Sequence, residues 1–312
     1  MITFGPVPSR RLGNSLGINN IPPKICSYSC VYCQIGKAIK IQFTRQQFYS
    51  PDQILADVEQ TLNTLAKKNI KVDYLSFVPD GEPTLDINLG KSIRILKKFN
   101  IPIAVITNAS LIWQEQVQQD LAQADLVNVK VDAVSEHIWK RIDKPHKNLN
   151  LQQILNGILL FSKSYNGILY TETMLVKDKN DIPDEIEKIA QFIAQVNPHT
   201  AFIGIPTRPP AENVLPADEH TINFAYNSFK NYIKNVELLL GSEAGNFAST
   251  SNIQDDILRI TAVHPMSQEA MDKFLKQNNA SMDIVNQLLE KGLILKTSYR
   301  NKTFYIRRFK KN

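Results

Sequence analysis

Residues 23 to 36 read Pro-Lys-Ile-Cys-Ser-Tyr-Ser-Cys-Val-Tyr-Cys-Gln-Ile-Gly, and this stretch holds all three cysteines of the 312-residue chain. Cys26, Cys30 and Cys33 are spaced C-x3-C-x2-C, so the three thiols lie on one short loop. An odd number of closely spaced cysteines makes a poor set of disulfides, but its thiolates can bind one metal centre. The loop therefore predicts a metal site.

Three kinds of site compete for this loop. A structural zinc site usually takes four protein ligands, and a catalytic one takes three plus water. None of the five histidines lies near the loop in sequence. A ferredoxin-like [4Fe–4S] cluster takes four cysteines, so three would leave one iron open to a small molecule. The remaining alternative is a set of reduced structural thiols.

The loop resembles the cluster-binding loop of the radical S-adenosylmethionine (radical SAM) superfamily, C-x3-C-x-φ-C, where φ is aromatic and is here Tyr32. The resemblance extends over residues 1 to about 240. It implies that the three cysteines hold a [4Fe–4S] cluster whose fourth iron binds S-adenosylmethionine. It further implies that one electron splits the sulfonium and that a 5′-deoxyadenosyl radical then abstracts hydrogen from a substrate. The cofactors carry this chemistry and the protein positions them.

The charge of the chain is unevenly distributed. Its formal net charge is +6, yet residues 291–312 carry eight lysines and arginines and no acidic residue, so the remainder is slightly acidic. The sequence has no apolar run long enough for a membrane span, and its first residues do not resemble a signal peptide. Reduced thiols and an oxygen-sensitive cluster predict a cytoplasmic protein.

From residue 70, short apolar runs alternate with longer amphipathic segments, which is typical of buried parallel strands joined by helices. Periodicity alone does not distinguish a doubly wound sheet from a barrel, and the family resemblance favours a partial (β/α)6 barrel of the TIM type over residues 1–240. The expected strands are 16–18, 72–78, 103–106, 126–131, 168–175 and 201–205, and the expected helices are 51–68, 89–99, 114–122, 151–162, 184–195 and 218–232.

In such barrels the chemistry lies at the carboxyl ends of the strands. The turn Pro79-Asp-Gly-Glu-Pro-Thr84 resembles the family's G-E-P motif, which binds the amino group of S-adenosylmethionine. By this resemblance Gly81 makes the turn, Glu82 supplies an acceptor and Pro83 adds stiffness. The alternative is an ordinary turn before a helix.

The segment Ile106-Thr-Asn-Ala-Ser-Leu111 resembles the family's T-N-G-x-L segment, with alanine where glycine is common. The resemblance implies that Thr107 and Asn108 face the cofactor, whereas the alternative is a capped helix start.

Polar residues also occur within two of the expected strands. Alternation along Asn128-Val-Lys-Val-Asp132 predicts that Asn128, Lys130 and Asp132 share one face, and the pattern resembles the family's ribose-binding strand. The alternative is an internal Lys130–Asp132 pair. Glu172 lies among apolar neighbours, so it must be paired or functional. It is expected to contact the cofactor or a lysine across the barrel.

Four charged residues are candidate substrate contacts. Arg10 and Arg11 lie in an N-terminal segment that, with the cysteine loop, resembles a radical SAM subgroup similar to wyosine-type tRNA synthases. Two arginines suit phosphate, although they can equally pair with carboxylates. Arg208 and Glu212 lie in a proline-rich loop after the last expected strand, where a solvated rim is the alternative.

The C-terminal residues differ in character from the barrel. After a linker at 241–251, residues 252–312 predict three helices (253–263, 267–277, 281–291) and a hairpin (293–297, 303–307), which is the pattern of a winged helix. Such modules usually bind nucleic acid. The third helix is not basic, whereas the hairpin and tail are, so we expect phosphate contacts rather than base reading. A protein-docking module is the alternative.

These observations predict a radical SAM enzyme that modifies RNA or tRNA. The chain has no cysteines left for a second cluster, so a flavodoxin- or ferredoxin-like partner must supply the electron. The alternatives are an enzyme that modifies a protein or peptide, as in glycyl-radical activation, and an iron–sulfur sensor whose winged helix regulates transcription.

Overall fold

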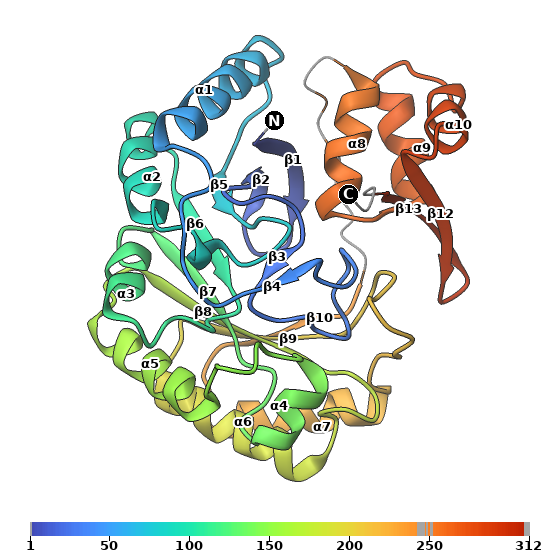
Figure 1. Cartoon of the computed structure of the whole chain (residues 1–312). Helices are drawn as coiled ribbons and strands as arrows, with labels where there is room; N and C mark the ends of the chain where they lie inside the picture. Colours follow the sequence, from blue (N-terminus) through green and yellow to red (C-terminus); the bar gives the residue numbers. More distant parts are fainter. Residues whose placement is uncertain (1, 242–246, 248, 250–251, 309–312) are drawn as a thin grey trace.

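The computed structural model describes residues 2–241, 247, 249 and 252–308, and its main feature is an eight-stranded sheet. The strands are β1 (Thr3–Ser9), β2 (Gly13–Ile18), β5 (Tyr74–Phe77), β6 (Ile103–Thr107), β7 (Leu126–Lys130), β8 (Ile168–Met174), β9 (Thr200–Gly204) and β10 (Val236–Leu239). They lie in this order across the sheet, and all neighbours are parallel except the β1–β2 pair. The sheet curls into a half barrel (Figure 1).

Helices cover the outside of this sheet (Figure 1). They are α1 (Pro51–Lys67), α2 (Leu89–Leu96), α3 (Glu115–Leu121), α4 (Glu136–Ile142), α5 (Leu151–Ser164), α6 (Pro183–Val196) and α7 (Glu219–Lys230), with 3-10 turns η1 (Pro83–Leu85) and η2 (Lys97–Phe99). Six strand-then-helix units run from β2 to α7. The predicted partial (β/α)6 barrel is thereby confirmed.

Helix α1 shows how local sequence sets an element. The Ser50 hydroxyl accepts a hydrogen bond from the Gln53 backbone N–H at 3.2 Å, and the Gln53 side chain accepts one from the Ser50 N–H at 2.8 Å. This reciprocal pair satisfies two amides that a helix start leaves without partners. One face of the helix is apolar and buried in the core of the half barrel, through Ile54, Val58 and Leu65.

The sheet has two strands that the sequence analysis did not predict, one at each edge. Strand β1 reads Thr-Phe-Gly-Pro-Val-Pro-Ser, and its prolines lack the N–H that a central strand needs, so an edge is where it fits. Strand β10 is only four residues long and follows a stretch with little apolar pattern. Both extend the barrel without changing its type.

Residues 252–308 form a second body with its own core. It comprises α8 (Ile253–Val263), β11 (Met266–Ser267), α9 (Gln268–Gln277), α10 (Asp283–Glu290), β12 (Ile294–Tyr299) and β13 (Lys302–Arg307). The three expected helices and the hairpin are present, and the short β11 joins the hairpin in a sheet ordered β11-β13-β12. The name winged helix stays a prediction, as do the domain boundaries, because most of the 241–251 linker lies outside the described residues.

The C-terminal body packs beside β1 at the open side of the half barrel (Figure 1). The Gln34 side chain donates to the Val263 carbonyl at 2.8 Å, and the Tyr299 hydroxyl donates to the Pro206 carbonyl at 3.3 Å. The body therefore contacts two loops at the rim of the barrel. Among the residues that the structure describes, no helix is long and apolar enough to cross a membrane.

Candidate active site

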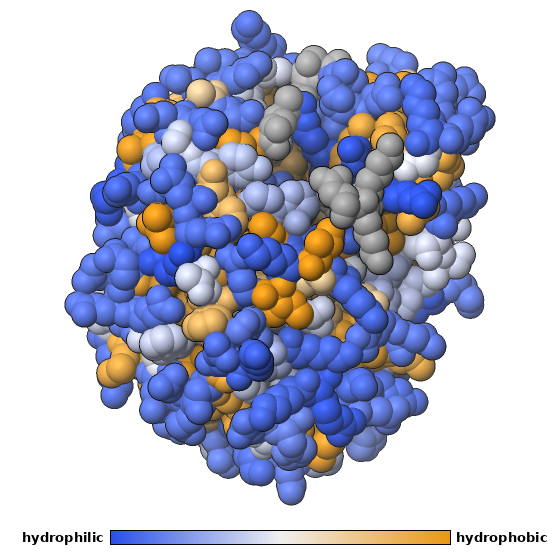
Figure 2. Space-filling model, viewed as in Figure 1, coloured by the Kyte–Doolittle hydropathy of each residue, from blue (hydrophilic) through white to orange (hydrophobic). Residues whose placement is uncertain are grey.

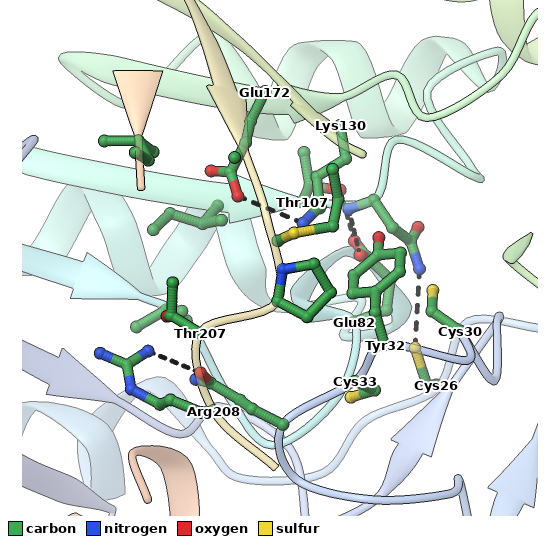
Figure 3. A pocket seen from close by; sticks show the side chains of 18 of the residues that line it. Cys26, Cys30, Tyr32, Cys33, Glu82, Thr107, Lys130, Glu172, Thr207 and Arg208 are labelled. Carbon is green, nitrogen blue, oxygen red and sulfur yellow. Dashed lines mark hydrogen bonds and ion pairs between the residues drawn. The ribbon is translucent and has the colours of Figure 1, made fainter. Parts of the chain in front are cut away.

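A pocket of about 280 Å³ extends from the cysteine loop into the interior of the half barrel (Figure 3). Most of the residues that the sequence analysis named for the site line it. They are Arg10, Arg11, Cys26, Cys30, Tyr32, Cys33, Gly81, Glu82, Thr107, Asn108, Lys130, Glu172 and Arg208. Pro83, Asn128, Asp132 and Glu212 are not among its lining residues.

Backbone hydrogen bonds give the cysteine loop its shape. A two-residue ladder pairs β3 (Ile25–Cys26) with β4 (Lys40–Ile41), and the Gln42 N–H donates to the Cys26 carbonyl at 2.9 Å. The Cys33 N–H donates to the Cys30 carbonyl at 3.1 Å. The three thiols are free and half-buried, and they line the same pocket (Figure 3). The loop therefore presents three sulfurs to one cavity.

The surroundings of the thiols disfavour their charged forms. Burial, with the nearby Glu82 carboxylate, raises the pKa of Cys26 to about 12. Burial also raises the pKa of Cys30 well above its usual range, and the Asp143 carboxylate adds to this effect. Thiolates bind metals, so a cationic centre in this cavity would take the place of the protons.

Zinc and an iron–sulfur cluster place different demands on the three thiolates. Within residues 2–241, 247, 249 and 252–308, no three His, Cys, Asp or Glu side chains lie close enough together for a single metal ion. A zinc ion holds each thiolate at about 2.3 Å, whereas an iron–sulfur cluster spreads its cysteines over separate irons. The Asn108 side chain donates to the Cys26 sulfur at 3.6 Å, a contact of the kind that tunes cluster ligands. Asn108 therefore contacts the cysteine loop through its side chain and Glu82 through its backbone.

Glu82 links the ends of two strands behind the cysteine loop. Its buried carboxylate accepts hydrogen bonds from the Thr107 hydroxyl at 2.6 Å and the Asn108 N–H at 2.8 Å, and also from the N–H and hydroxyl of Thr84. Burial raises the pKa of Glu82, and these hydrogen bonds oppose the rise. Thr107 and Asn108 thus hold Glu82 in place, which the sequence analysis did not predict.

Gly81 serves packing rather than a turn of unusual backbone geometry. A Cβ at this position would lie 1.8 Å from the Ile25 carbonyl oxygen, which belongs to the backbone just before Cys26. The glycine thus allows the two loops to approach closely.

The substitution Gly81→Ala should destabilise the chain and displace the cysteine loop. Forcing a methyl group into a packed site typically costs about 1–3 kcal/mol. Thermal unfolding and the rate of cysteine alkylation would measure the two effects, with Gly241→Ala as the control because its Cβ would meet nothing within 4 Å. Equal melting temperatures and equal alkylation rates in the two variants would contradict this account.

A buried charge cluster forms the inner wall of the pocket. The register of β7 and β8 places Lys130 beside Glu172, and the ammonium lies 3.3 Å from the carboxylate. The Asn128 amide donates to the same carboxylate at 3.0 Å. Arg11 also forms an ion pair with Glu172, reaching into the barrel from the β1–β2 turn. Glu172 therefore pairs with a lysine on the neighbouring strand. Of the two partners expected for Arg11, a phosphate or a carboxylate, the structure shows the carboxylate.

Asp132 lies two residues beyond the end of β7 and is not among the residues that line the pocket. Its carboxylate accepts hydrogen bonds from the Tyr32 hydroxyl and from the Met174 N–H, the latter at 2.7 Å. It thus fixes Tyr32 from behind the pocket and does not pair with Lys130.

Pro83 and Glu212 also lie away from the pocket. Pro83 is buried at the first position of η1, where its fixed φ suits the turn. Glu212 lies outside the pocket, with its carboxylate 2.5 Å from Lys144 and 3.7 Å from Lys37. These lysines lower the pKa of Glu212.

Asp143 is a site residue that the sequence analysis missed. It is buried, and the Cys30 thiol donates to its carboxylate at 3.3 Å. Its only sequence signal is an acidic residue directly after the apolar Ile142, a pattern that surface turns share. Burial and the neighbouring Asp132 raise the pKa of Asp143 well above its usual range.

Arg208 connects the pocket to the C-terminal body. Its guanidinium donates to the Gln34 side chain at 2.6 Å and lies 2.9 Å from the His264 ring. Burial and the arginine charge lower the pKa of His264 well below its usual value, so the ring is neutral and accepts the bond. Gln34 and His264 were both missed, because the contact joins positions far apart in sequence.

The chain is similar to several known proteins. The family model of the radical SAM superfamily matches residues 20–193. The chain is 47% identical to a UPF0026 protein of Methanocaldococcus jannaschii, over 99% of this chain and 97% of that protein. It is 27% identical to a probable dual-specificity RNA methyltransferase RlmN of Thermotoga petrophila, over 64% of this chain and 57% of that protein.

Among solved structures, TYW1 with a lysine–pyruvate adduct bound has a similar fold, with a TM-score of 0.55 and 16% identity over 70% of this chain and 74% of that chain. The family match covers the cysteine loop, Glu82, Asn108, Lys130 and Glu172. Because it also spans more than half of the sequence, this chain belongs to the radical SAM superfamily and is an enzyme of that type.

Proposed function

We propose that the chain holds a [4Fe–4S] cluster on Cys26, Cys30 and Cys33, binds S-adenosylmethionine against it and modifies RNA. The observation that carries the proposal is that three cysteine sulfurs share one pocket with the acceptor Glu82 and the donor Lys130. Bound there, the two cofactors supply a 5′-deoxyadenosyl radical that takes a hydrogen atom from the substrate.

The polar residues of the pocket suit the charged groups of S-adenosylmethionine. Of the four hydrogen bonds that Glu82 accepts, three go to Oε1 and one, from the Asn108 N–H, goes to Oε2, so Oε2 keeps a lone pair for an ammonium group. Lys130 lies at the wall, where it can donate to a carboxylate or a ribose oxygen. Because Lys130 is paired with Glu172, which also pairs with Arg11, this donor is fixed before a ligand binds.

The same pocket also has an apolar part. Val78, Ile106, Met174 and Leu239 line it beside the polar groups. An apolar lining suits a purine ring and reduces the water near a reactive radical. The pocket thus offers both polar groups for the charged parts of the cofactor and apolar ones for its aromatic part.

The C-terminal body supports RNA as the substrate class. It touches the pocket rim through Tyr299, which binds the Pro206 carbonyl, and through His264, which binds Arg208. Its hairpin exposes Lys296, Arg300 and Lys302. Basic side chains of this kind position a phosphate backbone. The similarity to an RNA methyltransferase points the same way.

Anaerobic reconstitution with iron, sulfide, S-adenosylmethionine and dithionite tests the proposal. We expect 5′-deoxyadenosine to form, faster when RNA from a strain lacking this gene is added. Nucleoside profiles of that strain and its parent would then identify the product. A lack of 5′-deoxyadenosine with every substrate would favour the sensor alternative, and stimulation by peptides alone would favour a protein substrate.

The basic side chains of the hairpin give a separate prediction for RNA binding. Each phosphate contact contributes about 0.7–0.9 to the slope of log K against log salt. The double variant Lys296→Ala/Arg300→Ala should weaken RNA binding and reduce that slope, while Lys91→Ala/Lys98→Ala on and beside α2 serves as the control. A slope equal to that of the parent chain would count against RNA contact by the hairpin.

A further inference from the structure

The outer side of the cysteine loop exposes apolar side chains among lysines. Ile39 is 62% exposed and Ile41 is 41% exposed, and Lys37 and Lys40 are exposed beside them. We refer to Lys37, Ile39, Lys40 and Ile41 as the loop patch. Figure 2 shows hydrophobic side chains surrounded by hydrophilic ones near the centre of the face that carries β4.

The loop patch is built on the backbone that holds the cysteines. Ile41 lies opposite Cys26 in the β3–β4 ladder, and the Ile39 N–H donates to the Lys24 carbonyl at 2.9 Å. On the other side, the Gly36 N–H donates to the Cys33 carbonyl at 3.1 Å. The patch is therefore built on the same backbone ladder as Cys26, with Ile41 as the direct partner of that cysteine.

The charge around the patch is predominantly positive. Lys37 and Lys144 flank Glu212, at 3.7 Å and 2.5 Å, so this carboxylate offsets only part of their charge. Lys40 makes no ion pair with any described residue. An apolar centre with a basic rim suits an acidic protein that binds transiently, because rim charges steer association and apolar contacts complete it.

We propose that the loop patch docks the one-electron carrier, a small acidic protein with a flavin or an iron–sulfur group. This inference rests on the proposed function. That function needs an external reductant, because the chain has only three cysteines and all three bind the first cluster, so no cysteine remains to bind a second. One electron moves: the carrier is oxidised and the centre held by the cysteines is reduced. Electron tunnelling falls steeply with distance, and Ile41 lies opposite Cys26 in the β3–β4 ladder, so docking here brings the carrier close to the cysteine loop.

The test compares two reductants on a variant of the patch. Ile39→Glu/Lys40→Glu reverses one charge and adds another, whereas neither residue lines the pocket. With reduced acidic flavodoxin, we expect the KM for the carrier to rise at least about tenfold. With dithionite, a small reductant that needs no docking, the rate of 5′-deoxyadenosine formation should stay unchanged.

A matched control is available on helix α5. The exposed fraction of Leu160 is 61%, nearly the same as that of Ile39, and Lys163 on the same helix is also exposed. The double variant Leu160→Glu/Lys163→Glu therefore makes the same chemical change far from the loop. This control should keep the parent KM for flavodoxin. Added salt should raise the KM of the parent chain more than that of the patch variant, since screening acts on the charges that the variant has lost.

If the patch variant has the same KM for flavodoxin as the parent chain, the patch is not the docking surface. The same conclusion follows if the patch variant loses RNA binding but keeps the flavodoxin kinetics of the parent chain. Titration of oxidised flavodoxin against the parent and both variants measures docking without turnover. Should the parent chain yield no 5′-deoxyadenosine with either reductant, the proposed function fails. The titration would still decide whether flavodoxin binds at the patch.

Discussion

The variant Cys30→Ala should lose its iron, its visible absorption band and all formation of 5′-deoxyadenosine. Cys30 is the central cysteine of the loop, and its sulfur lies in the pocket with those of Cys26 and Cys33. With two protein ligands, a four-iron cluster keeps neither its attachment nor its orientation. Iron and sulfide content after anaerobic reconstitution, the absorption spectrum and product analysis would measure the losses.

Ser29→Ala is the control for this variant because Ser29 lies on the same loop but not in the pocket. Its hydroxyl accepts one long hydrogen bond, from the Ala38 N–H at 3.3 Å. This control should keep iron and activity, and circular dichroism should show that both variants are folded. Retention of iron and of the absorption band in Cys30→Ala would show that the ligand assignment is wrong.

Local spacing predicted the parts of the site that depend on one loop or one strand. The cysteine pattern placed three thiols together, and alternation along β7 placed Asn128 and Lys130 on one face. The apolar setting of Glu172 indicated that it needs a partner. The residues involved are only a few positions apart in sequence. Within one strand or one short loop, such a spacing fixes which side chains lie on the same side.

Contacts between distant segments could not be predicted in this way. Asp143 reaches Cys30 from the end of α4, and His264 reaches Arg208 from the C-terminal body. Arg11 enters the barrel from the turn after β1, an edge strand that was not predicted because it contains two prolines. In each case the sequence shows a polar residue with no local peculiarity, and only the packing of whole elements brings the partners together.

The role of Gly81 shows the same limit within a recognised motif. The motif suggested that Gly81 makes a turn, whereas the glycine makes room for the Ile25 carbonyl of the cysteine loop. Glu82 likewise joins the ends of β5 and β6 through Thr107 and Asn108. The motif thus aligns the two halves of the pocket as well as offering groups to a ligand.

Removal of the Glu172 carboxylate should cause the largest loss of stability among single changes at the wall of the pocket. The Glu172 side chain is 8% exposed, and those of Lys130 and Arg11 are each 19% exposed, so Glu172→Ala leaves two poorly solvated cations without their shared anion. Breaking a buried ion pair typically costs about 3–5 kcal/mol. We therefore expect the free energy of unfolding to fall by about 3 kcal/mol or more in urea titrations.

The exposed pair on helix α4 provides the control. Glu136 lies 2.6 Å from Lys140, but its side chain is 66% exposed, so Glu136→Ala should change stability by less than about 1 kcal/mol. Lys130→Ala and the double variant Lys130→Ala/Glu172→Ala complete a cycle that isolates the coupling between the two groups. If Glu172→Ala proves as stable as Glu136→Ala, water must solvate the wall, and the pocket cannot hold its donors in the fixed positions on which ligand binding depends.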